Sequence, residues 1–195
     1  MLNIYKSFVR QNLEFCVQLW SPTPEHGNWA TIMEIESIQR KFTRLINGIG
    51  LMTYKERLQK LKITTLIERR ARGDLIEVFK IFHGICSYGD SFFKYSRSGM
   101  KIVCSKNSSS INTFEMRVVK YWNKLPDIVK SAKDVTDFKK RLENFKSRNL
   151  NKPGNYWELS DKIFDSINDE NRQSFAEFMI ENPYIAKRRY VNVKL

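Results

Sequence analysis

The chain has 195 residues, 42% of them hydrophobic and 28% charged, which is the composition of a globular protein and excludes an intrinsically disordered one. Its formal net charge is +13, and all of the excess lies in residues 1–150, where 27 Lys and Arg stand against 14 Asp and Glu. This imbalance favours a polyanion partner, whereas no apolar run approaches the roughly 18 residues that a transmembrane helix requires, so we predict no membrane partner.

The first predicted helix covers residues 3–20, where apolar side chains recur at three- and four-residue intervals. We expect one continuous stripe facing the core, made of Tyr5, Phe8, Val9, Leu13, Cys16 and Trp20. A second helix is predicted over residues 30–47, and its expected inner residues are Ile35, Ile38, Phe42 and Leu45. Its outer side carries the first candidate phosphate-binding group, which is Arg40, Lys41 and Arg44.

The next two helices have capping signals in the sequence. Thr53 is expected to cap a short helix, and Thr65 followed by Glu68 fits a capping box that begins a longer one. The longer helix has an apolar stripe of Ile67, Ala71, Leu75, Val78 and Phe82. Gly84 provides a natural end to it.

Three arginines on this helix, Arg69, Arg70 and Arg72, form the second candidate group. Glu68 precedes Arg72 by four residues and Asp74 follows Arg70 by four, so these two arginines have acidic neighbours on the helix surface, whereas Arg69 has none. A solvated helix face and a phosphate-binding face look the same in a sequence, and both interpretations remain open.

Residues 87–110 have weak periodicity and many serines, so we predict a long loop with at most a short β segment near residues 101–104. Two further helices follow, one ending before Pro126 and one capped by Asp134. The second carries the third candidate group, which is Lys139, Lys140 and Arg141. The aromatic residues expected in the core are Trp20, Trp122, Phe138 and Phe145.

These patterns predict a mainly α fold, an irregular bundle of roughly six to eight helices. The run "NLNKPGN" separates a basic helical domain, residues 1–149, from a short helical C-terminal extension, residues 150–195. Within the extension, helices are expected at residues 159–167 and 171–181.

No catalytic or cofactor site is recognisable in the sequence. Closely spaced glycines that cradle a nucleotide are absent. His83 and Cys86 form an HxxC pair, but no second pair supplies the remaining ligands of a zinc site. We therefore predict no catalytic residue, metal ligand, cofactor or small-molecule substrate. The three widely spaced cysteines, with no signal peptide before them, favour a reducing intracellular compartment.

Five stretches stand in a fixed order between residues 5 and 145: "YKSFVR…LEFCVQLWSP", "IQRKFTRLINGI", "TYKERLQKLKITTLIERRARGDLIEVFKIFHGI", "RVVKYWNKLP" and "DVTDFKKRLENF". Together they resemble the C-terminal third of the reverse transcriptase of LINE-type, non-LTR retrotransposons of the jockey-like group. Two departures stand against the match. The family's "F/Y-x-D-D" metal-binding box does not occur in this chain, and Gln11 stands where proline is expected after "VR".

The resemblance implies a thumb region and the segment after it, a helical unit that holds the template–primer duplex. It implies sequence-independent phosphate contacts with an RNA–DNA hybrid or duplex, the rest of a retroelement polyprotein as a partner, a nuclear location, and no polymerase activity from this chain alone. The alternative is a host-recruited or degenerate helical protein-interaction module with no nucleic-acid role. Its contact surface would be residues 156–184, which lie within the C-terminal segment 151–195, where 7 Lys and Arg balance 7 Asp and Glu.

Overall fold

The computed structural model of this protein describes residues 1–22, 29–86, 93–96, 100–103, 114–150, 155–165 and 167. The chain divides into two compact units, Met1–Ser160 and Asp161–Leu195. Residues 158–165 are helical, in agreement with the helix predicted to begin at residue 159. The helix predicted over residues 171–181 lies outside the described residues, and the domain boundary expected after residue 149 stays a prediction.

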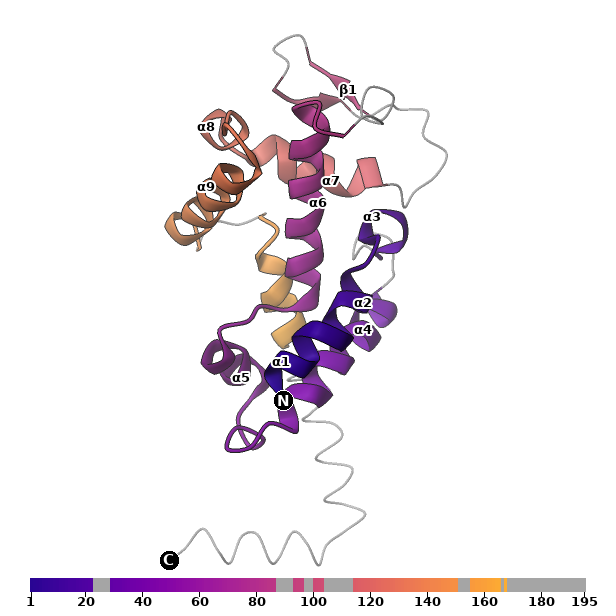
Figure 1. Ribbon diagram of the computed structural model, residues 1–195, viewed down its shortest axis with the longest axis vertical. Helices are drawn as coiled ribbons and strands as arrows, with labels where there is room; N and C mark the ends of the chain where they lie inside the picture. The colour runs from indigo at the N-terminus through magenta and orange to yellow at the C-terminus, as the bar shows by residue number, and fades with distance from the viewer. Residues whose placement is uncertain are drawn as a thin grey trace, which may run out of the picture. The chain divides into compact units, whose positions relative to one another are not determined.

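The first unit is mainly helical, which confirms the predicted fold class. Its longest helix, α6 (Leu66–Phe82), runs through the middle of the unit (Figure 1). The helices in contact with α6 are α2 (Arg10–Glu14), α3 (Val17–Trp20), α4 (Trp29–Arg44), α7 (Phe114–Lys124) and α9 (Val135–Arg148). Helix α5 (Tyr54–Leu61) packs on α4, and α8 (Asp127–Lys130) packs on α9.

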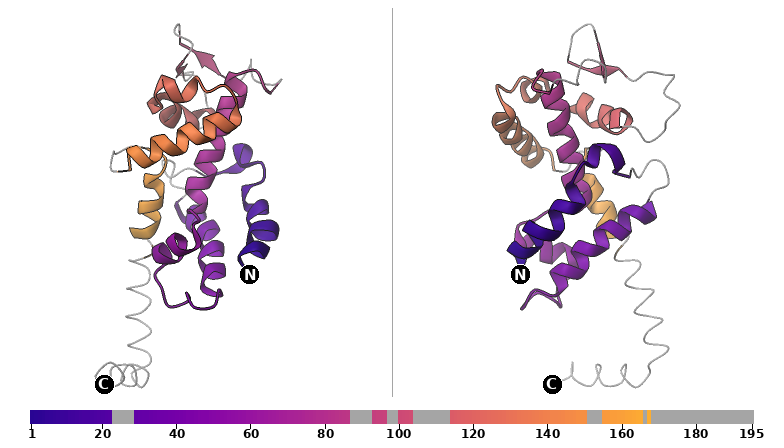
Figure 2. Two further views of the ribbon diagram at one scale, coloured as in Figure 1. Left: turned by 60° about the vertical axis from the view of Figure 1, so that its left-hand side comes forward. Right: turned by 45° about the vertical axis from the view of Figure 1, so that its right-hand side comes forward.

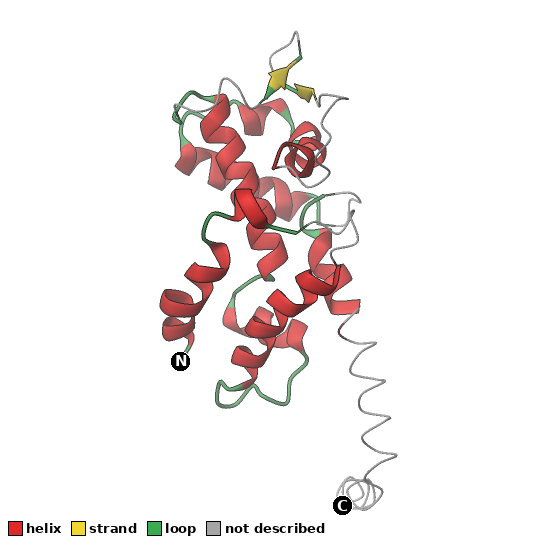
Figure 3. Ribbon diagram, turned by 90° about the vertical axis from the view of Figure 1, so that its right-hand side faces the viewer, coloured by secondary structure: helices red, strands yellow, loops and turns green. Residues whose placement is uncertain are grey.

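Two short strands lie near the C-terminal end of α6 (Figure 3). They are β1 (Lys94–Tyr95) and β2 (Ile102–Val103), which pair antiparallel with Lys94 opposite Val103. The short β segment expected near residues 101–104 is therefore present.

The apolar core lies where α6, α7 and α9 meet. Phe79, Trp122 and Phe138, one from each helix, are fully buried, and the rings of Phe79 and Phe138 stack with centroids 4.4 Å apart. Tyr156 and Trp157 belong to the same core. Trp122 and Phe138 thus occupy the positions expected of them, and the first two residues of segment 156–184 are core residues rather than surface ones.

The prediction of one continuous helix over residues 3–20 is wrong. The segment is divided into α1 (Leu2–Ile4), a π-helical turn η1 (Tyr5–Val9), α2 and α3, with a break at Phe15 and Cys16. Cys16 adopts a left-handed conformation with φ 48°. As a result the expected stripe is not continuous.

The break is held by contacts from outside the segment, made by Arg117, and by one contact within it, made by Trp20. The guanidinium of Arg117 on α7 donates to the carbonyl oxygens of Val17 (3.0 Å) and Gln18 (3.2 Å). The indole N–H of Trp20 donates to the carbonyl of Phe15 (2.7 Å). These bonds turn α3 away from the line of α2. Periodicity within the segment contains no information about Arg117.

The inner face of α4 is polar, which also differs from the prediction. Ile38 and Leu45 were expected inside but are 39% and 62% exposed. The buried residues of the helix are Ile32, Glu36, Gln39 and Thr43, spaced four, three and four apart. The helix was therefore predicted correctly, but its buried face was assigned to the wrong residues.

Hydrogen bonds explain how this polar face is buried. The amide oxygen of Gln39 accepts from the Tyr5 hydroxyl (2.8 Å), and its nitrogen donates to the Tyr54 hydroxyl (2.8 Å) and the Thr64 carbonyl (3.0 Å). The hydroxyl of Thr43 accepts from Arg57 Nε (3.1 Å). Because buried polar groups are tolerated when they are hydrogen-bonded, this network holds together the N-terminal segment, α4 and α5.

Glu36 extends the network to α6. Its carboxylate accepts from the backbone N–H of Leu66 (3.0 Å), the N–H of Ile67 (3.4 Å) and the Tyr54 hydroxyl (2.5 Å). The N-terminal amides of a helix have no partner within it, so Glu36 satisfies two of them from another helix. Burial raises the pKa of Glu36, while the Tyr54 hydrogen bond and the Arg70 charge oppose this shift. The N-cap predicted at Thr65 is confirmed, since its hydroxyl accepts from the Glu68 amide. The second half of the predicted capping box is replaced, because the Glu68 carboxylate binds Lys146 and Ser160.

Replacement of Glu36 is expected to destabilise the first unit. In Glu36→Gln a single neutral amide oxygen must replace two charged oxygens, so we expect the free energy of unfolding to fall by about 1–3 kcal/mol. Urea unfolding followed by circular dichroism measures this change. Glu34→Gln removes an exposed carboxylate from the same helix and should change the value by less than about 0.5 kcal/mol. Equal losses in the two variants would contradict the role assigned to Glu36.

Candidate nucleic-acid interface

A basic groove crosses the N-terminal half of α6. It has a volume of 570 Å³ and is lined by residues of the N-terminal helices, of the turn before α6, of α6 and of α9. Figure 2 shows α9 and the N-terminal helices on opposite sides of α6 in the left-hand view. Its cationic lining residues are Lys6, Arg10, Lys62, Arg69, Arg70, Arg72, Lys139 and Lys146. Only Glu14, Glu68 and Glu143 oppose them, so the lining has a formal excess of five positive charges.

Each of the three acids joins two structural elements. Glu14 on α2 accepts two hydrogen bonds from Arg69 on α6, one of them from Nη2 at 3.0 Å, which raises the pKa of Arg69. Glu68 on α6 binds Lys146 on α9. Part of the positive charge thus holds the walls of the groove together.

The helix-surface neighbours expected from the sequence do not act as partners. Arg72 lies 3.9 Å from Glu143 of α9 instead of pairing with Glu68. Asp74 binds Arg117 of α7 at 3.2 Å instead of Arg70. Glu68 and Asp74 are both 5% exposed, so they face other helices, and partners there replace the neighbours on α6.

The structure brings together four of the nine candidate site residues. Arg69, Arg70, Arg72 and Lys139 line the groove. Among the described residues that line the groove, the other five candidates do not appear. These five are Arg40, Lys41, Arg44, Lys140 and Arg141.

For Lys140 and Arg141 this exclusion follows from helical geometry. Consecutive residues on a helix point about 100° apart, so three basic residues in a row cannot face one groove. Lys140 is exposed, and Arg141 binds Asp137 (2.8 Å) and the carbonyl of Ile128 (2.6 Å). On α4, Lys41 and Arg44 are exposed.

Four cations of the groove were not among the candidates. Lys146 follows Lys139 by seven residues, with Glu143 between them, which is the spacing of one helix face. Lys6 and Arg10 are four residues apart and share a face in the same way. Helical spacing was thus a signal for these three residues. Lys62 had no such signal, because it lies after α5 in a left-handed conformation with φ 51°.

Other kinds of site find no support in the described residues. They contain no group of three or more His, Cys, Asp or Glu that could hold a metal ion, and no helix long and apolar enough to cross a membrane. In the HxxC pair, His83 Nδ1 lies 3.0 Å from the Phe79 carbonyl oxygen, and the Cys86 thiol contacts Glu77 (3.6 Å).

Comparison with known proteins adds no assignment: no family model, no curated protein and no solved structure matches this chain.

The contact between Glu14 and Arg69 is expected to stabilise the fold measurably. In a double-mutant cycle of Glu14→Ala and Arg69→Ala, we expect a coupling energy of about 1 kcal/mol, because the pair is bidentate and largely shielded. Chemical denaturation of the four proteins measures it. The matched control is the double-mutant cycle of Arg72 and Glu143. Because their contact is longer, we expect a coupling energy below about 0.5 kcal/mol. A coupling no larger than that of the control would contradict the proposed link between α2 and α6.

Proposed function

We propose that this protein binds nucleic acid through the basic groove, as a helical module that corresponds to the C-terminal region of a LINE-type reverse transcriptase. The observation that carries the proposal is the convergence of eight cations from four parts of the chain on one groove. The run "TTLIERRARGD", part of the family resemblance, supplies three of these cations. The ligand class is an RNA–DNA hybrid or duplex, and the resemblance adds the remainder of a retroelement polyprotein as a partner and the nucleus as the location.

Two chemical features of the groove support backbone binding rather than sequence recognition. Its lining is dominated by Lys and Arg, which contact phosphates without reading bases. Hybrid duplexes of A-like form are recognised mainly through their shape, phosphates and 2′-hydroxyls, which suits cations presented from several helices. Affinity is then expected to fall steeply with salt, because each phosphate contact releases condensed counterions.

Removal of three groove cations, the exposed Lys62 and Lys139 and the half-buried Lys6, tests this function directly. In the triple variant Lys6→Met, Lys62→Met, Lys139→Met, we expect the slope of log affinity against log salt concentration to decrease by about 2–3, since each lost phosphate contact contributes about 0.9. Fluorescence anisotropy of a labelled RNA–DNA hybrid, titrated at several salt concentrations, measures this slope.

The matched control removes three cations that do not line the groove. The triple variant Lys41→Met, Arg44→Met, Lys140→Met makes the same change in net charge and should keep the slope of the wild type. If both triple variants lose the same affinity, general charge rather than the groove binds the ligand. If the wild-type protein does not bind the hybrid at low salt, the proposal fails and the protein-interaction module becomes the better explanation.

We expect this chain to have no polymerase activity by itself. Two-metal phosphoryl transfer needs closely placed carboxylates, and the sequence has no aspartate-pair box of the family's type. Incubation of the purified chain with a primed template, deoxynucleotides and Mg²⁺ should leave the primer unextended. Extension that survives further purification of the chain would sink this expectation.

A further inference from the structure

Arg70 differs from every other cation of the groove. It is only 2% exposed, and none of its three guanidinium nitrogens has a hydrogen-bond partner among the described residues. Arg69 and Lys146 each bind an acid. Lys139 is exposed on α9. Arg70 alone combines burial with a complete lack of hydrogen bonds in this groove.

The acids nearest to Arg70 are engaged elsewhere. Glu36 binds the N-terminal amides of α6, Asp74 binds Arg117, and Glu14 binds Arg69. Their charges act on Arg70 from a distance and oppose the lowering of its pKa that burial causes. One weak contact is present, with the Arg70 Cζ atom 5.9 Å from the centroid of the Trp20 ring. A buried cation with five unused N–H donors is unstable unless a partner completes it.

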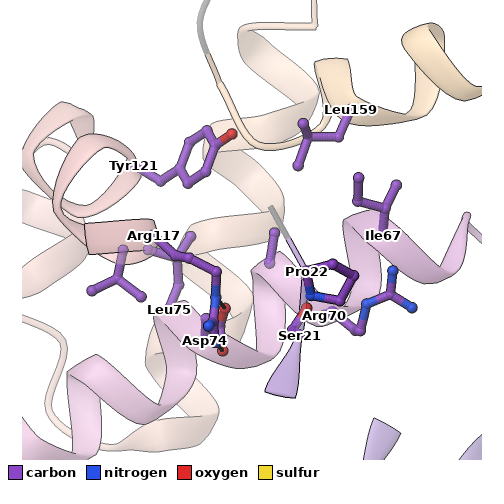
Figure 4. A pocket seen from close by; sticks show the side chains of 11 residues that line it. Ser21, Pro22, Ile67, Arg70, Asp74, Leu75, Arg117, Tyr121 and Leu159 are labelled. Carbon is purple, nitrogen blue, oxygen red and sulfur yellow. Dashed lines mark hydrogen bonds and ion pairs between the residues drawn. The ribbon is translucent and has the colours of Figure 1, made fainter. Parts of the chain in front are cut away.

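Arg70 lines two hollows of the structure. One is the basic groove, and the other is a pocket of 30 Å³ that Pro22, Arg117 and Tyr121 also line. Figure 4 shows the guanidinium of Arg70 pointing away from the Arg117–Asp74 pair. Because the side chain is long and its head makes no hydrogen bond, it can turn toward the groove without breaking one.

We propose that Arg70 is a phosphate-binding residue at the floor of the groove, with donors that pair with the oxygens of one phosphate group when a ligand is bound. The planar guanidinium fits two phosphate oxygens at once, which a lysine cannot do. This inference rests on the proposed function for its ligand, a phosphate of a nucleic-acid backbone. Free inorganic phosphate has the same chemistry, and the experiment separates the two sources.

The two consequences of this role go in opposite directions. In the free protein, Arg70→Met replaces an unpaired buried charge by an apolar chain of similar length, so the melting temperature should stay the same or rise. In the complex, the same variant loses a charge-assisted bidentate contact, so affinity for a labelled RNA–DNA hybrid should fall about 30-fold. If Arg70 only supported the fold, its replacement would lower both the melting temperature and the affinity for the hybrid.

Lys139→Met is the matched control, because it removes an exposed cation of the same groove. It should weaken hybrid binding about five-fold and leave the melting temperature unchanged. Arg70→Lys keeps the charge but not the planar donors, so it should recover only part of the affinity. A fall in the melting temperature of Arg70→Met by more than about 4 °C, or a loss of affinity no larger than that of Lys139→Met, would overturn the proposal.

Inorganic phosphate provides the second arm, added at constant ionic strength against chloride. A rise in melting temperature that occurs in the wild type and not in Arg70→Met supports the site and shows that it accepts free phosphate. If this rise occurs and the wild type does not bind the hybrid, the phosphate site stands while the proposed function fails. If the wild type binds the hybrid and Arg70→Met binds it equally well, the function stands and the role of Arg70 is refuted. If neither ligand has any effect on the wild type, both fail.

Discussion

The buried carboxylate of Glu36 is the interaction on which the rest of the first unit depends. It joins α4 to the first turn of α6 by accepting backbone N–H groups that have no partner within their own helix. A buried carboxylate is costly unless it is hydrogen-bonded, and here Tyr54 supplies a further donor. Because Arg69 and Arg70 lie in the next turn of α6, their positions in the groove depend on where this carboxylate holds the helix.

Local signals in the sequence were sufficient for most of the helices. Thr53, Thr65 and Asp134 cap the helices that they were predicted to cap, since a cap involves atoms only a few residues apart. The polar inner face of α4 was not predictable in this way. Glu36 and Gln39 look like solvent-facing residues until their partners, which are far away in the sequence, are known. The break at Cys16 depends in the same way on Arg117.

The candidate site, like the fold, was predictable from the sequence only in part. Two of the three charge runs lie on helices that line the groove, α6 and α9, whereas the run on α4 does not. Even on α9 only one face reaches the groove, as Lys139 does and Lys140 does not. The sequence posed a choice for the three arginines of α6 between solubility and phosphate binding. In the structure Arg69 is tied to Glu14, Arg70 is buried without a hydrogen bond, and Arg72 is half-buried near Glu143. Arginines close together in one helix therefore have three different environments, and no single interpretation of the run applies to all of them.

Under the proposed function, this difference determines how the groove would bind a polyanion. Cations paired with acids maintain the shape of the groove, and a phosphate has to compete with Glu14 or Glu68 for them. Exposed cations such as Lys139 would attract the proposed ligand but would lose part of the gain in free energy, because both partners shed water. A buried guanidinium without a hydrogen bond has already lost its water during folding, so a phosphate that reaches it restores interactions instead of exchanging them. For this reason Arg70, whose charge is the most deeply buried in the groove, would gain the most free energy from an anionic ligand.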